Sequence, residues 1–189
     1  MASSAKRVGM ITAFQRNLTE LLDSIEDCLA KRRILPCLML LYSGIDVIAS
    51  LEAGRASRSA FTKWVNRYVL KSTSLSCTAS DLYGARCGIL HTLSAESDMS
   101  RKGQARQIVY AWGAAKAADL ALTSKGIGRT DCAIHIRELI DAFRSGLADY
   151  LDEVMRDDNR QQRLYEGASL WLTHMDQGTV KAFLRAHTT

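Results

Sequence analysis

The segment from Leu35 to Leu51 constrains the fold of this chain more than any other feature. Its apolar residues lie on nearly every side of a helix that Pro36 can start, because a proline in the first turn sacrifices no hydrogen bond. Asp46 interrupts the apolar run, which is shorter than the roughly 20 residues that a membrane-spanning helix requires. The sequence therefore predicts a helix at the centre of a folded core, and no membrane partner.

Apolar residues elsewhere recur at steps of three and four, the spacing of amphipathic helices. Gly54 is a predicted helix stop, and Ser57 or Ser59, and then Thr78 or Ser80, are predicted helix caps. The chain has one proline and 189 residues, which suits a single domain over residues 1–189 with a core from about 10 to 175. The predicted fold class is mainly α, an up-and-down helical bundle. Its remaining helices are expected at about Met10–Leu29, Phe61–Leu70, Leu82–Leu90, Ile136–Met155 and Asp158–Met175.

Two short runs are rich in residues that favour strands, Gln107 to Trp112 and Cys132 to Ile136. A helical stretch from Ala115 to Leu122 and a turn at Gly126 and Gly128 separate them. We expect these runs to form a small β-hairpin appendage. The serine-rich segment before them, residues 92–104, has no apolar period and is expected to be an exposed loop.

The composition of the chain bears on its cellular compartment and on the metals, cofactors and partners that it could use. The five cysteines include no C-x-x-C pair, so the sequence predicts neither a disulfide framework nor a zinc site, and we expect no metal and no cofactor. The first seven residues lack the apolar core of a secretory signal, which favours a cytoplasmic protein. The net charge of +5 permits a polyanionic partner, and a basic solvated surface explains it equally well.

Arg86 and His91 are the candidate catalytic residues. They lie five positions apart on a predicted helix, a step of about 140°, so the long arginine side chain or a helix end must bring them together. A neutral imidazole can take a proton near pH 7, and a guanidinium binds phosphate oxygens through two hydrogen bonds. The pair therefore suits a phosphodiester. In the structural alternative, Arg86 pairs with a carboxylate such as Asp81, and His91 is a satisfied helix-end residue.

The segment Arg86-Cys87-Gly88-Ile89-Leu90-His91 resembles the R-x4-6-H motif of HEPN (higher eukaryotes and prokaryotes nucleotide-binding) domains. The order of helices around it is also similar to that superfamily, in which a four- or five-helix bundle carries the motif on a late helix. The resemblance covers roughly residues 10–175. Two positions depart from common HEPN patterns. Cys87 stands where Asn, Asp or His often follows the arginine, and Leu93 replaces the tyrosine of the R-x4-H-x-Y variant.

The resemblance implies a metal-independent endoribonuclease, a toxin or a phage-defence or stress effector, whose cleft forms across a homodimer. It implies that His91 acts as general base or acid for attack by a ribose 2′-OH and that Arg86 orients and neutralises the scissile phosphate. The expected partners are RNA, a second copy of the chain, and an antitoxin or regulatory protein. The alternative is a catalytically inactive helical module that binds a protein or a nucleotide.

Further residues are predicted to support this site, and each has a structural alternative. Asp81 and Tyr83 precede Arg86 within helical reach and are expected to fix its rotamer. Cys87 lies four positions from His91, a spacing that suits a thiolate and its base and that packing residues also share. Arg101, Lys102 and Arg106 are expected to clamp phosphates near the cleft.

Two further sets have structural readings that compete with a functional one. A basic stripe on the third helix either steers RNA or is an ordinary solvated face, and it consists of Arg55, Arg58, Lys63, Arg67 and Lys71. The three tryptophans are expected in the core or an interface and not as base-stacking platforms, and they are Trp64, Trp112 and Trp171.

Overall fold

The apolar central segment forms the core helix that the sequence predicts. The computed structural model describes residues 4–71, 73–168, 178, 181 and 185, and for residues 4–13 it describes the backbone alone. Helix α2 (Ile34–Ala53) packs against α1 (Ser4–Ala30), α3 (Arg58–Trp64), α4 (Ala79–Thr92) and α8 (Asp158–Ala168). By length and composition α2 is also able to cross a membrane, a test that core helices of soluble proteins pass as well, and half of its most apolar window is buried.

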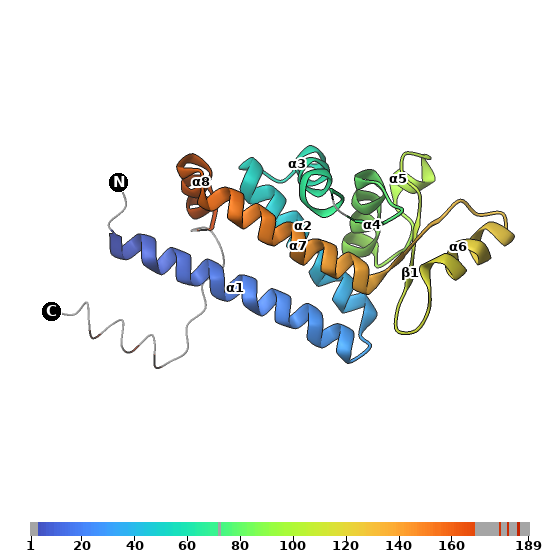
Figure 1. Ribbon diagram of the computed structural model, residues 1–189, viewed down its shortest axis with the longest axis horizontal. Coiled ribbons are helices and arrows are strands. Elements are labelled where there is room, and N and C mark those ends of the chain that lie inside the picture. Colours follow the sequence, from blue (N-terminus) through green and yellow to red (C-terminus); the bar gives the residue numbers. More distant parts are fainter. Residues whose placement is uncertain (1–3, 72, 169–177, 179–180, 182–184, 186–189) are drawn as a thin grey trace.

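The other long helices surround α2 and make the fold a mainly α bundle. Helices α1 and α7 (Ile136–Met155) run along the length of the molecule, and α8 lies near the start of α1 (Figure 1). Glu26 of α1 connects the two long helices, because its carboxylate accepts hydrogen bonds of 2.8 Å from both Arg137 and Arg144 of α7. The predicted helices at 10–29 and 136–155 are confirmed by α1 and α7.

Several helices begin or end at the capping and stop residues that the sequence predicts. Gly54 ends α2 with a φ of 70°, a left-handed conformation that glycine adopts without steric cost, and the Ser57 hydroxyl caps α3. Thr78 and Asp81 form a reciprocal capping box at the start of α4. The third helix is less regular than its sequence predicts, because a π-helical turn, η1 (Val65–Val69), continues α3.

The two strands lie where the sequence predicts them, but they do not form a hairpin. Strands β1 (Ile108–Ala111) and β2 (Cys132–His135) pair in parallel, with Ile108 opposite Cys132. A hairpin requires antiparallel strands and a short turn, whereas α6 (Ala117–Gly126) here crosses over from the end of β1 toward the start of β2. The prediction of a β-hairpin is wrong for this reason, and the appendage is a small β-α-β unit at the end of the molecule away from the start of α1 (Figure 1).

The segment 92–104 is not the uniformly exposed loop that its sequence predicts. It contains a one-turn helix, α5 (Asp98–Arg101), which Ser97 caps, and both Ser97 and Met99 are buried. This turn lies against α4 and covers Gly84. The last predicted helix begins at Asp158 as expected and is described to Ala168. The rest of that prediction, to Met175, lies outside the described residues.

Candidate functional site

Helix α4 brings Arg86 and His91 together near its C-terminal end. Leu82 and Ile89 anchor the helix in the core, which turns the opposite face toward solvent. Arg86 is half-buried, His91 is exposed, and Arg86 Nη1 lies 2.9 Å from His91 Nε2. A guanidinium has no acceptor atom, so Nη1 donates to Nε2, and the proton of the neutral imidazole lies on Nδ1. The long arginine side chain thus closes the 140° step between the two positions.

Asp46 of α2 holds the other end of the guanidinium. Arg86 Nη2 donates to Asp46 Oδ2 at 2.6 Å, and these side chains are only 17% and 21% exposed. Burial lowers the pKa of Arg86, but the hydrogen bond and the charge of Asp46 outweigh burial, so the pKa lies above its ordinary value. The sequence contained a signal for this residue, since a lone carboxylate in an apolar helix needs a cationic partner. Asp46 is therefore a site residue that sequence reasoning missed.

Tyr83 and Arg58 complete the surroundings of the pair. The guanidinium carbons of Arg86 and Arg58 each lie 5.9 Å from the centre of the Tyr83 ring, a cation–π distance. Tyr83 thus lies beside Arg86, and its supporting role stays a prediction. Cys87 follows Arg86 on the same helix and is half-buried. Arg58, which the sequence placed on a separate basic stripe, brings a second positive charge next to the site.

The ion pair between Asp46 and Arg86 is expected to be energetically coupled. In a double-mutant cycle with Asp46→Ala and Arg86→Ala, we expect a coupling free energy of about 1–3 kcal/mol, because both groups are largely removed from water. Urea unfolding of the four proteins measures it. The exposed pair Asp27–Lys31, with side chains 56% and 55% exposed, is the matched control, and its coupling should stay below about 0.5 kcal/mol. Equal coupling in the two pairs would contradict a desolvated contact at Asp46.

Asp81 does not fix the rotamer of Arg86, and the corresponding prediction is wrong. Its side chain is 4% exposed and binds Arg106 instead, accepting from the Arg106 backbone N–H at 2.7 Å and from Nη2 at 2.7 Å. Arg106 also donates to the carbonyl of Ser76 at 2.8 Å. The guanidinium of Arg106, which the sequence predicts as a phosphate clamp, is therefore already bound to other groups of the protein. The physical reason is that capping α4 turns Asp81 away from the outer face that carries Arg86.

The carboxylate of Asp81 is expected to make stability depend on pH. Burial raises its pKa, but hydrogen bonds from Thr78 and Arg106 outweigh burial and lower the pKa below 3.8. The stabilisation is therefore complete above pH 3.8 and is lost as the pH falls through the folded-state pKa. Asp81→Asn should lower the free energy of unfolding at pH 7 by about 2–3 kcal/mol, and the deficit should shrink toward pH 3. A deficit that is the same at pH 7 and pH 3 would argue against the ion pair as its cause.

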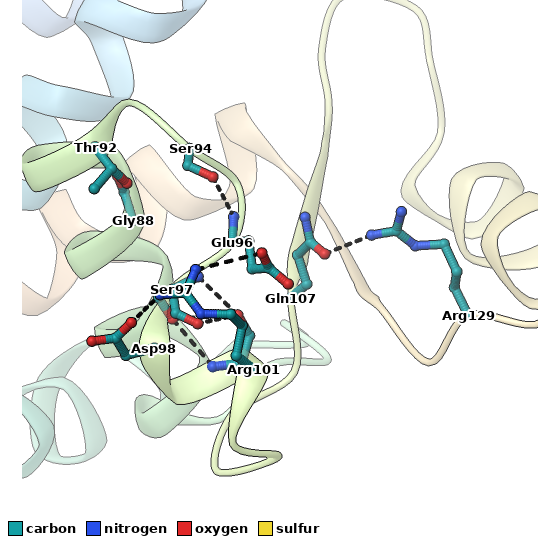
Figure 2. Close-up of polar contacts among 10 residues, drawn as sticks. Gly88, Thr92, Ser94, Glu96, Ser97, Asp98, Arg101, Gln107 and Arg129 are labelled. Carbon is teal, nitrogen blue, oxygen red and sulfur yellow. Dashed lines mark hydrogen bonds and ion pairs between the residues drawn. The ribbon is translucent and has the colours of Figure 1, made fainter.

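Arg101 and Lys102 lie on the segment that follows the motif. Arg101 pairs with Asp98 and lies 3.6 Å from Glu96, so its charge is shared among exposed carboxylates. Lys102 is exposed at the end of α5. Figure 2 shows this segment folded against the end of α4, where the Thr92 hydroxyl donates to the carbonyl of Gly88 at 2.9 Å. It also shows Arg129 bound to Gln107 nearby, at 2.6 Å.

The structure also shows where the basic stripe, the tryptophans and the cysteines lie. The stripe residues Arg55, Arg58, Lys63, Arg67 and Lys71 are exposed, and Arg67 pairs with Glu153 at 2.6 Å. Trp64 is a core residue, Trp112 is 43% exposed and not in the core, and Trp171 lies outside the described residues. All five cysteines are free thiols. Within the described part of the chain, no three His, Cys, Asp or Glu side chains are grouped so that they could hold a metal ion.

Comparison with known proteins identifies no relative of this chain. No family model, curated protein or solved structure matches the chain. The geometry of the site and the resemblance carried by residues 86–91 are therefore the two grounds for proposing a function.

Proposed function

We propose that this protein is a metal-independent endoribonuclease of the HEPN type, with Arg86 and His91 as its catalytic residues. The observation that carries the proposal is the 2.9 Å contact between a half-buried guanidinium and an exposed imidazole. A phosphate-binding group and a proton-transfer group lie side by side at the surface, as cleavage of RNA at its own 2′-hydroxyl requires. The nearby guanidinium of Arg58 adds positive charge to which a phosphate is attracted.

In the proposed reaction, the scissile phosphate binds Arg86 and draws Nη1 away from His91, which frees Nε2 as a base. Nε2 takes the proton of the ribose 2′-OH, and the 2′-oxygen attacks phosphorus. The bond to the 5′-oxygen breaks, and that oxygen takes a proton from an acid. The products are a 2′,3′-cyclic phosphate on one fragment and a 5′-OH on the other. Asp46 acts as a positioning residue, since it holds Nη2 while Nη1 moves.

A second copy of the chain is the proposed source of the acid, through a homodimer with two such motifs at one cleft. Exposed apolar side chains follow the site residues directly in the sequence, Val47 after Asp46 and Leu93 two residues after His91, with 39% and 61% of their surface exposed. A homodimer seated on this surface would bury both side chains. The biological role that fits such an enzyme is that of a toxin or defence effector in the cytoplasm, restrained by an antitoxin or regulatory protein.

The competing function is a catalytically inactive helical module that binds a protein or nucleotide partner. One observation favours it, namely that Arg86 is already neutralised by Asp46 within the fold. In that case Arg86 stabilises the contact between α2 and α4, and His91 has no catalytic role. The two functions differ in whether RNA is cleaved.

The test is incubation of the purified full chain with a mixed-sequence RNA in excess EDTA. We expect cleavage products that end in 2′,3′-cyclic phosphates, detected by mass spectrometry, and a dimer in light scattering. Expression in bacteria should arrest growth. Intact RNA after long incubation, with no growth arrest, would favour the inactive module.

A further inference from the structure

A cavity of about 550 Å³ opens on the protein, and neither Arg86 nor His91 lines it. Its walls are the C-terminal end of α1 with the turn that follows, the loop after β1, and the junction between β2 and α7. Its volume falls within the range of roughly 300–1,000 Å³ that is typical of small-molecule sites. None of the described residues that line it is acidic.

The chemistry of the walls is aromatic and cationic. Trp112 lies in the loop after β1 and is 43% exposed, although a tryptophan of a folded domain is more often largely buried. Arg32 and Arg137 line the same cavity from two other segments. Leu29 and Ala30 provide an apolar wall. An exposed indole ring and the guanidinium of Arg32 in one cavity suit a ligand that has both a flat ring and negative charge.

The lining is held in place before any ligand binds. His135 Nδ1 accepts a hydrogen bond of 3.1 Å from the backbone N–H of Arg137, so the proton of the neutral ring lies on Nε2. That nitrogen donates to the carbonyl of Gly113 at 3.3 Å, which ties the loop carrying Trp112 to the start of α7. Arg137 is fixed by Glu26, which accepts from its Nη1 at 2.8 Å and 2.9 Å. A preformed site of this kind binds a ligand with less loss of conformational entropy.

Arg32 adds an observation from the backbone. It has a φ of 56° in the turn between α1 and α2, a left-handed conformation in which glycine would be less strained. Among the described residues its guanidinium makes no ion pair with a carboxylate. The fold therefore keeps an arginine at a position that disfavours a side chain, and that side chain lines the cavity.

We propose that this cavity binds a nucleotide unit, with the base stacked on Trp112 and the phosphate bound by Arg32. Two sources have this chemistry, a free mononucleotide and one nucleotide of an RNA strand. The proposal does not depend on RNA cleavage, because it concerns binding at a different set of residues.

The test is isothermal titration calorimetry of the full chain with 5′-AMP, 5′-UMP and a 2′-O-methyl oligoribonucleotide of eight residues, which cannot be cleaved at its 2′ positions. Trp112→Ala should weaken binding at least tenfold, since stacking of one base on an aromatic ring contributes about that much. Arg32→Gly should weaken binding to a similar extent. It should not lower the melting temperature, because glycine suits a φ of 56°.

Two control variants separate binding from folding. Trp112→Phe keeps an aromatic face and should bind within about threefold of the wild type. Arg156→Ala removes an exposed arginine that lies outside the basic stripe and does not line the cavity, and it should leave binding unchanged. Binding of the mononucleotides assigns the site to free nucleotides, and binding of the oligonucleotide alone assigns it to an RNA strand. The proposal is overturned if the wild type binds none of the probes, or if Trp112→Ala and Arg32→Gly both bind as well as the wild type.

Discussion

Replacing His91 with alanine is expected to slow RNA cleavage by roughly 10²–10⁴-fold, the usual contribution of a general acid or base. Binding of RNA should change little, because the imidazole transfers a proton and makes no lasting bond to phosphate. The fold should also persist, since His91 is exposed and, among the described residues, forms a side-chain hydrogen bond only with Arg86, at 2.9 Å. Single-turnover cleavage of a labelled RNA measures the rate, and the melting temperature checks the fold.

Chemical rescue makes this prediction specific to the imidazole. Added imidazole should restore part of the activity of His91→Ala and none of the activity of Arg86→Ala, because a small base can enter the space that the ring leaves. Arg86→Lys should remain poorly active, since an ammonium group does not reproduce two parallel hydrogen bonds to phosphate. If His91→Ala cleaves RNA at the wild-type rate, the proposed mechanism is wrong, and cleavage by another part of the surface must be sought.

Replacing Gly88 with alanine is expected to lower the free energy of unfolding by about 2–3 kcal/mol, which is a fall of roughly 5–10 °C in melting temperature. An alanine Cβ at this position would lie 2.5 Å from the carbonyl oxygen of Ser94 and 2.9 Å from that of Glu96. Both atoms belong to the backbone, so the segment after α4 must move as a whole. Thermal unfolding followed by circular dichroism measures the change.

Gly126→Ala is the matched control for this substitution. Gly126 lies at the end of α6, and a Cβ there would meet nothing within 4 Å. Alanine is the better helix former by about 1 kcal/mol, so this variant should be as stable as the wild type or more stable. Opposite signs for the same chemical change would establish close backbone contact as the reason for Gly88. A stable Gly88→Ala protein would show that the segment 94–96 does not pack tightly against α4.

Local sequence signals were sufficient for the long helices, whereas the one-turn helix α5 and the π-helical turn η1 were not predicted. Apolar spacing places α1, α2 and α7, Gly54 ends α2, and Thr78, one of the two predicted caps, starts α4. The separation of Arg86 and His91 also predicted that the long arginine side chain or a helix end would have to bring them together, and the arginine side chain does so. Each of these features depends on residues within one or two turns of one another, so no knowledge of distant segments is needed.

The tertiary structure decided which distant groups meet. Asp46 and Arg86 are forty positions apart, and Asp81 and Arg106 are twenty-five apart, so no local spacing connects them. The same holds for the parallel pairing of β1 and β2, which depends on the crossover of α6, and for the cavity that joins Arg32 and Trp112. Burying the apolar faces of the helices fixes their relative positions, and only then do charged and aromatic side chains acquire the partners from which a site is built.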